Sequence, residues 1–297
     1  MSSLHSDRQL YPLTTVVPTL GRKCLRGAVE ALNRGTIVPD EILICIPENE
    51  VRRVSKFDFP NVKIIATHKK GQVFQRSVGF KNATHSIVMQ LDDDFYVDRH
   101  CVEQLLKTLT AEDSKVAVAP SPLCISSGEA VFKKNENSKL QAFYYCLVNG
   151  KTGYQPGAIC LSGFAFGVDP GVGSNSVRNV EWLPGGCVMH RRENLILEDF
   201  FPFEGKAYSE DLIHSLLLKD RGCKLIVDTL AHCHTEVLNL LSYGPLEFLK
   251  ILIADYRARK YFVRLSSRSL LRMNFQYIVR LLNYFGKMIV GRFLGFT

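Results

Sequence analysis

Residues 87–94 read IVMQLDDD, a short and mostly apolar run that ends abruptly in Asp92, Asp93 and Asp94. Such a run predicts a buried β-strand. Three adjacent carboxylates repel one another unless a cation or water compensates their charge. In an extended backbone Asp92 and Asp94 project to the same side, so both can face one ion. The segment therefore predicts a Mg²⁺ or Mn²⁺ site at the end of a strand, with a solvated acidic loop as the alternative.

Strand-like and helix-like segments alternate on both sides of this run. The pattern predicts strands at 13–18, 41–46, 62–66, 116–119 and 224–228, and helices at 21–32, 72–82, 102–109 and 209–219. This alternation indicates βαβ units, and hence an α/β fold whose mostly parallel sheet is covered by helices on both faces. Ligands of such sheets bind outside the carboxyl ends of the strands. That edge would hold Pro18, Thr19 and Glu48 together with the aspartates.

The charge is unevenly distributed along the chain. The 297 residues include 37 Lys and Arg against 29 Asp and Glu, a net charge of +8. Nine of the basic residues and none of the acidic ones lie in residues 256–297, which leaves 28 basic and 29 acidic residues before them. A near-neutral body with a basic end argues against a nucleic-acid partner. We expect a folded body at 1–240 and a basic helical tail at 241–297.

The tail has the pattern of an amphipathic helix. A basic amphipathic helix without acidic residues predicts contact with an anionic membrane surface. Packing against the body or against a second subunit is the alternative. Arg272, Arg280 and Lys287 fall on a different face from the apolar residues. The apolar face follows steps of three and four residues, through Leu271, Phe275, Ile278, Leu282, Phe285, Ile289 and Phe293.

The cysteines and the first residues bear on the cellular compartment. The nine cysteines show no paired spacing, the first ten residues are polar, and no apolar run of membrane-spanning length occurs. We therefore expect free thiols, no signal peptide and no transmembrane helix, as in a cytoplasmic protein. Together with the tail, this predicts a peripheral protein on the cytoplasmic face of a membrane.

Three later features add chemistry. Residues 184–186 read PGG, a turn without side-chain bulk that suits the close approach of a ligand and equally suits a hairpin. Glu210 and Asp211 open a predicted helix, whose dipole keeps a carboxylate ionised. That suits a general base, and ordinary helix capping is the alternative. His232 and His234 alternate to one side after a predicted strand, as metal ligands or as structural histidines.

Taken together, these segments resemble a known family. The chain is similar to GT-A-fold inverting glycosyltransferases of family 2 in LTTVVPTLGR (13–22), EILICI (41–46), QRSVGFKNATHSIVMQLDDDF (75–95), WLPGGCVMHRRE (182–193), YSEDLIHSLLLKDRG (208–222) and the late histidines. The resemblance extends over residues 13–234. It implies a GT-A domain at 1–240, with a nucleotide-sugar half at 10–120 and an acceptor half at 121–240.

The resemblance implies which residues contact the donor. This donor would be a nucleoside-diphosphate sugar, with a UDP-sugar favoured. Many family members have an Asp after the second strand to hold uracil, where this chain has Glu48, and this departure leaves the identity of the base open. The donor-binding residues would be Pro18, Thr19, Glu48, Arg76, Asp92, Asp93, Gly185 and Gly186.

The resemblance also implies the catalytic and metal-binding residues. Asp211 would be the catalytic base, with Glu210 beside it. Asp94 would ligate Mn²⁺ or Mg²⁺ on the diphosphate of the donor. A late histidine, either His232 or its close competitor His234, would be a further ligand.

The sequence therefore predicts a metal-dependent inverting glycosyltransferase. Its acceptor would be a hydroxyl of a glycan or a lipid-linked molecule in cell-surface polysaccharide or glycoconjugate synthesis. A nucleotidyltransferase acting on a sugar phosphate also uses strand-end aspartates, but that alternative leaves the PGG turn and the Glu210-Asp211 pair unexplained. A nucleotide-sugar or glycan binding protein without catalysis is the third interpretation, and the presence of Asp94 and Asp211 argues against it.

Overall fold

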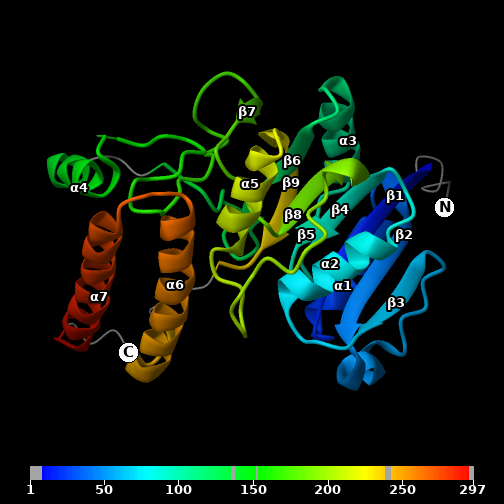
Figure 1. Ribbon diagram of the computed structural model, residues 1–297, viewed down its shortest axis with the longest axis horizontal. Helices are drawn as coiled ribbons and strands as arrows, with labels where there is room; N and C mark the ends of the chain where they lie inside the picture. Colours follow the sequence, from blue (N-terminus) through cyan, green and yellow to red (C-terminus); the bar gives the residue numbers. More distant parts are fainter. Residues whose placement is uncertain (1–8, 135–137, 152, 238–241, 294–297) are drawn as a thin grey trace.

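A nine-stranded sheet forms the body of the protein (Figure 1). The computed structural model describes residues 9–134, 138–151, 153–237 and 242–293, without the side chains of residues 288–293. The strands are β1 (Gln9–Pro18), β2 (Ile37–Pro47), β3 (Val62–Thr67), β4 (Ile87–Leu91), β5 (Tyr96–Val97), β6 (Val116–Cys124), β7 (Val177–Asn179), β8 (Cys187–Arg191) and β9 (Lys224–Thr235). The α-helices are α1 (Cys24–Asn33), α2 (Gln72–Asn82), α3 (Cys101–Ala111), α4 (Lys139–Asn149), α5 (Glu210–Asp220), α6 (Pro245–Leu265) and α7 (Leu270–Phe293).

Helices cover both faces of the sheet, because alternate residues of a strand point to opposite sides. In β1, Leu13 and Val17 join a core with residues of α1 and α3. Val16, on the opposite side of the same strand, joins a second core with Phe80 of α2. The α5 helix adds Leu218 to a third core, formed with β6, β8 and β9. The predicted α/β fold with helices on both faces is thus confirmed.

The sheet is parallel in its first part and mixed in its second. Its strand order is β3-β2-β1-β4-β8-β6-β9-β5, with β7 paired to β9. The strands β1 to β4 pair in parallel, whereas β8 runs antiparallel between β4 and β6. The expectation of a mostly parallel sheet therefore holds for β1 to β4 and for the β6–β9 pair. Apolar patterning identifies a strand without giving its direction, which is why the antiparallel direction of β8 was not foreseen.

The direction of β8 positions the PGG turn. Cys187, the first residue of β8, lies opposite Leu91, the last residue of β4. Residues 184–186 precede Cys187, so they lie beside the aspartates that follow Leu91.

The helices α6 and α7 pack onto the body through a shared core. In Figure 1 they stand side by side at one end of the molecule, with α4 next to α7. Because this core contains side chains from both the body and the tail, the tail is part of the folded unit. Its members include Trp182, Leu212, Ile213, Phe262, Val263, Met273 and Tyr277.

A buried carboxylate on α6, that of Asp255, joins the tail helices to the body. It accepts hydrogen bonds from the Tyr277 hydroxyl (2.9 Å) and from Arg280 Nη1 (2.8 Å), both on α7. Arg259 Nη2 lies 3.4 Å from it, and the hydroxyl of Ser209 donates to it over 3.4 Å. Burial opposes the charge of Asp255, but Arg259 and Arg280 hold its pKa below the usual value. Ser209 directly precedes α5, so this network reaches the start of that helix.

Arginines of the tail bind either the body or the buried carboxylate of the tail itself. Arg268 donates to the carbonyl oxygen of Ile159 (2.8 Å), and Arg272 donates to that of Cys146 (3.0 Å). Arg280 is committed to Asp255. These charges stabilise backbone carbonyls and a buried carboxylate. The expectation that the basic face of the tail is directed to a membrane surface is therefore wrong for Arg272 and Arg280.

The apolar face predicted for the tail points outward. Leu271, Phe275, Ile278 and Leu282 are exposed, whereas Met273, Tyr277 and Tyr284 are buried. Phe285 is half-buried, and the side chains of Ile289 and Phe293 lie outside the described residues. The helix therefore packs through its aromatic and arginine side and leaves its aliphatic side free of the body.

Two sequence predictions concern the boundary and the membrane. The predicted boundary at residue 240 falls in residues 238–241, which lie outside the described part of the chain, so it stays a prediction. Among the residues that the structure does describe, no helix is both long enough and apolar enough to span a bilayer.

We expect Asp255→Ala to lower the free energy of unfolding by about 3 kcal/mol, because Arg259 and Arg280 would lose their buried counter-charge. Chemical denaturation followed by the fluorescence of Trp182 measures this, since the single tryptophan lies in the core shared with the tail. The control Asp220→Ala removes an exposed carboxylate at the end of α5 and should change stability by less than about 0.5 kcal/mol. Equal losses in the two variants would show that Asp255 does not hold the tail.

Candidate active site

The segments after β1, β2 and β4 meet at one edge of the sheet. Pro18 ends β1 and is buried, and the backbone N–H of Thr19 donates to the carbonyl oxygen of Cys45 (3.0 Å). Gln75 of α2 donates to the carbonyl oxygens of both Thr19 (2.7 Å) and Cys45 (2.6 Å). Glu48 follows β2 at the same edge and is exposed. This is the edge at which the strand-end rule predicts a ligand.

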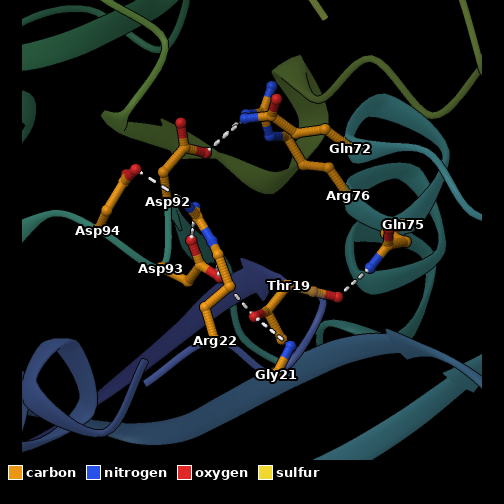
Figure 2. A network of polar contacts seen from close by, with 9 residues as sticks. All are labelled: Thr19, Gly21, Arg22, Gln72, Gln75, Arg76, Asp92, Asp93 and Asp94. Atoms are coloured by element: carbon orange, nitrogen blue, oxygen red, sulfur yellow. Dashed lines mark hydrogen bonds and ion pairs between the residues drawn. The ribbon is translucent and has the colours of Figure 1, made fainter. Parts of the chain in front are cut away.

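The three aspartates point in different directions (Figure 2). Asp92 accepts hydrogen bonds from Gln72 of α2 (2.8 Å) and from Arg76 Nη2 (3.1 Å). Asp93 is buried and accepts from the hydroxyl of Thr19. Asp94 is 45% exposed. The middle aspartate therefore supports the loop after β1, and Asp92 and Asp94 border the open edge from two sides.

A residue missed by the sequence interpretation, Arg22, compensates this cluster of negative charge. Its Nη2 atom binds Asp93 and also lies 3.2 Å from Asp94 Oδ2. The hydrogen bond to Asp93, supported by the charges of both aspartates, raises the pKa of Arg22. The Arg22 side chain remains 55% exposed at the edge where a ligand would bind. The signal in the sequence was a basic residue shortly after the first predicted strand, in PTLGRK.

Arg76 is buried between two carboxylates, not placed in an open binding site. Its Nη1 atom lies 2.8 Å from Glu210 Oε1, and its Nη2 atom lies 3.1 Å from Asp92 Oδ1. Burial opposes its charge, but Glu210 and Asp92 raise the pKa of Arg76. Burial raises the pKa of Asp92 to about 6 despite the nearby guanidinium. Arg76 thus links the end of β4 to the start of α5, a link that sequence spacing does not reveal.

The two glycines of the PGG turn allow the strand end and the helix start to meet. A Cβ atom on Gly185 would lie 3.0 Å from Glu210 Oε1 and 3.1 Å from the Cβ atom of Asp211. A Cβ atom on Gly186 would lie 2.2 Å from the ring of Phe95, closer than such contacts allow. The carbonyl oxygen of Gly186 accepts from the N–H of Asp92 (2.8 Å). The turn therefore brings residues far apart in the sequence into one site.

Asp211 has the properties of a proton acceptor. It is partly exposed in the first turn of α5, where its Oδ1 atom accepts from the N–H of Leu212 (2.9 Å). Shielding from water by the surrounding protein is the main cause that raises the pKa of Asp211 to about 7, and the negative charge of Glu210 is the second. A carboxylate with a pKa near neutrality can both take up and release a proton at physiological pH.

Comparison with known families fits this geometry. The sequence profile described as "Glycosyl transferase family 2" matches residues 14–167, just over half of the chain. The chain belongs to this family. The match includes Thr19, Arg22, Arg76 and the aspartates, whereas Asp211 lies beyond it. The place of Asp211 in the candidate site of this family 2 member therefore rests on its contacts.

Solved structures share the fold of this family 2 chain. A crystal structure described as GalNAc-T7 with UDP, GalNAc and Mn²⁺ matches with a TM-score of 0.55 and 15% identity, over 80% of this chain and 47% of that one. This chain thus spans about half the length of that structure. At this identity the likeness shows the fold alone, and it confirms the predicted GT-A fold.

Two structures of S. aureus TarS, residues 1–349, also match. The first has a TM-score of 0.48 and 12% identity, over 84% of this chain and 65% of that one. The second, in complex with UDP-GlcNAc, has a TM-score of 0.49 and 12% identity, over 84% and 66%. No match was found among curated proteins.

The predicted metal ligands of this family 2 member have different surroundings in the structure. The Nε2 atom of His234 lies 2.7 Å from Asp98 Oδ1, so that ring is already engaged. His232 Nδ1 is buried without a hydrogen-bond partner among the described residues. Within this described part, no three His, Cys, Asp or Glu side chains are arranged to hold a metal ion. The assignment of Asp94 and one late histidine, His232 or His234, as metal ligands stays a prediction.

Asp94 nevertheless fits a cation that arrives with its substrate. Its half-exposed carboxylate faces the open edge and has Arg22 as an ion-pair partner. Mg²⁺ is usually bound by one or two carboxylates together with substrate phosphates, so a complete protein cage is not required. Asp94 would hold such a cation, and His232, with its unpartnered ring nitrogen, is the better candidate of the two histidines.

We expect Arg76→Met to destabilise the protein by about 3 kcal/mol near pH 8, because Asp92 and Glu210 would lose their buried counter-charge. Without the guanidinium, the folded-state pKa of Asp92 should rise above about 6. A carboxyl group with a raised folded-state pKa costs stability when it is ionised, so the loss should shrink as the pH falls toward 5. Denaturant unfolding at both pH values measures this difference.

The matched control is Arg34→Met, at an exposed arginine that follows α1. It should leave stability nearly unchanged at both pH values. If Arg76→Met loses the same stability at pH 5 as at pH 8, unpaired carboxylates are not the cause.

Proposed function

We propose that this chain is a metal-dependent inverting glycosyltransferase that uses a nucleoside-diphosphate sugar, with a UDP-sugar favoured. The acceptor is a hydroxyl of a glycan or lipid-linked molecule in cell-surface polysaccharide or glycoconjugate synthesis. The observation that carries the proposal is the position of Asp211, a carboxyl group with a pKa of about 7 beside the PGG turn and the strand-end aspartates. Family membership and the GT-A fold support it.

The donor would lie across the strand edge of residues 10–120. Thr19, Glu48, Asp92 and the PGG turn border this edge. The description of the GalNAc-T7 structure includes UDP and Mn²⁺, which supports a UDP-sugar and Mn²⁺ or Mg²⁺ for this chain. A divalent cation held by Asp94 would supply positive charge to the diphosphate. The exposed guanidinium of Arg22 would add a second positive charge from the protein itself.

The acceptor would bind to the half formed by residues 121–240, which contains the start of α5. Asp211 would take the proton from the acceptor hydroxyl as its oxygen attacks the anomeric carbon. The bond to the nucleoside diphosphate breaks on the opposite side of that carbon, and the released diphosphate keeps the bonding electrons. One displacement of this kind inverts the anomeric configuration. Arg76 would fix the distance between the donor and the catalytic base Asp211, because it binds both Asp92 and Glu210.

The cellular location of this reaction is a proposal from the sequence. All nine cysteines lie in the described residues and are free thiols, as expected for a reducing compartment. We therefore propose that the transfer takes place on the cytoplasmic face of a membrane, with the protein bound peripherally.

Asp211→Asn should lower kcat by about 10²–10⁴-fold, because an amide cannot accept the proton of the acceptor. A donor screen that measures nucleoside diphosphate release, with Mn²⁺ or Mg²⁺ against EDTA, identifies the substrate for this comparison. Asp220→Asn, on an exposed residue at the other end of α5, is the matched control and should keep full activity. Release of pyrophosphate instead would indicate a nucleotidyltransferase, and donor binding without any release would indicate a binding protein.

The dependence of kcat/KM on pH should show an acidic limb near pH 7, since Asp211 acts only when deprotonated. The negative charge of Glu210 helps to raise the pKa of Asp211. Glu210→Gln should therefore move the limb to lower pH, by about one unit. An unchanged limb in Glu210→Gln would exclude Asp211 as the titrating group.

A further inference from the structure

One end of the molecule exposes apolar side chains from two helices. On α4 the exposed residues are spaced by three and four positions, and on α7 by four, three and four, so each set forms one face of its helix. Leu161, in the segment that follows α4, is exposed between them. We call this the α4–α7 surface; its members are Leu140, Phe143, Leu147, Leu161, Leu271, Phe275, Ile278 and Leu282.

The two helices are joined into one continuous surface. The N–H of Ser162 donates to the carbonyl oxygen of Val148 on α4 (3.1 Å), and its hydroxyl donates to Gln276 on α7 (2.7 Å). The N–H of Ser269 donates to the carbonyl oxygen of Leu161 (2.8 Å). In Figure 1, α4 and α7 lie at the end of the long axis away from β3. Large apolar side chains gathered in this way mark an interaction surface, unlike single exposed ones.

The two helices that form this surface carry charge of one sign. Residues 138–151 and 256–287 contain no Asp or Glu. Exposed cations lie at the ends of the two helices, with Lys139 and Lys151 at α4, and Arg264 and Lys287 before and within α7. Arg272 and Arg280 are engaged in contacts within the protein, whereas these other cations are available to a partner.

We propose that the α4–α7 surface binds the surface of an anionic lipid bilayer. Aliphatic and aromatic side chains would enter the boundary between headgroups and acyl chains, and the flanking cations would meet anionic headgroups. A second copy of this chain fits less well, because a two-fold contact would bring the same cations together with no carboxylate to offset them. The sequence pattern alone indicated the tail; the structure adds α4 and excludes the arginines that face the body.

The proposed contact also orients the protein. The surface lies at the end of the molecule formed by α4 and α7, and the strands β1 and β2 lie in the other half (Figure 1). A nucleotide-sugar would then reach its edge from the aqueous phase. The lipid contact rests on the proposed membrane location but not on sugar transfer, so vesicle binding and transfer activity can fail separately.

The test is co-sedimentation with vesicles of phosphatidylcholine, alone or with about 30% phosphatidylglycerol. The wild-type protein should bind the anionic vesicles at least about tenfold more tightly than the neutral ones, and the variant Phe143→Glu with Ile278→Glu should lose about tenfold in binding. Both residues are exposed, at 61% and 56%, so the substitutions should leave the fold intact. Trp182 fluorescence and nucleoside diphosphate release check the fold and the transfer activity independently.

The matched control is Leu10→Glu with Leu230→Glu. These residues are 61% and 62% exposed on β1 and β9, outside the surface, and the control carries the same change of charge. It should bind anionic vesicles within about twofold of the wild type. The proposal is overturned if Phe143→Glu with Ile278→Glu binds as well as the control. It is also overturned if light scattering shows a wild-type dimer that this variant dissociates, since the occupant would then be a second copy.

Discussion

A buried guanidinium holds the two parts of the candidate active site together. Arg76 binds Asp92 at the end of β4 and Glu210 at the start of α5. Removing either carboxylate would leave charge uncompensated in the interior, which costs several kcal/mol, so the contacts restrain both elements. Asp211 follows Glu210 directly, and its distance from the strand edge depends on this link. The PGG turn makes the arrangement possible, because its glycines leave space for Glu210, Asp211 and Phe95.

The tail also supports the start of α5, through a network that is centred on a buried carboxylate instead of a buried guanidinium. Asp255 is a buried carboxylate held by arginines and by Tyr277, and it also accepts from Ser209 at the start of α5. The start of that helix is therefore stabilised from the strand edge by Arg76 and from the tail by Asp255. This explains why Arg259 and Arg280 of the tail are directed inward. It also leaves the apolar side of α7, together with that of α4, as a separate surface.

Much of the fold could be predicted from local patterns. The predicted strand 87–91 and helix 72–82 coincide with β4 and α2, and the predicted helix 209–219 differs from α5 by one residue at each end. Such elements are set by residues close in the sequence, whose spacing shows directly. Of the candidate site, the strand-end aspartates and the PGG and Glu210-Asp211 segments lie together as predicted. Arg22 and the two ion pairs of Arg76 were missed, because ion-pair partners distant in sequence leave no periodic signal.

The sequence by itself determined the α/β class, the position of the aspartates at a strand end, the resemblance to family 2 and the location of the excess positive charge. Only the tertiary structure decided which charges are paired, how β8 runs, and which side of the tail is covered. Helical spacing shows that a helix has an apolar side, but packing selects the side that is buried. In α7 the side with Met273, Tyr277 and Arg280 packs inward, because these residues complete a core and neutralise a buried carboxylate. The side with Ile278 and Leu282 is therefore exposed.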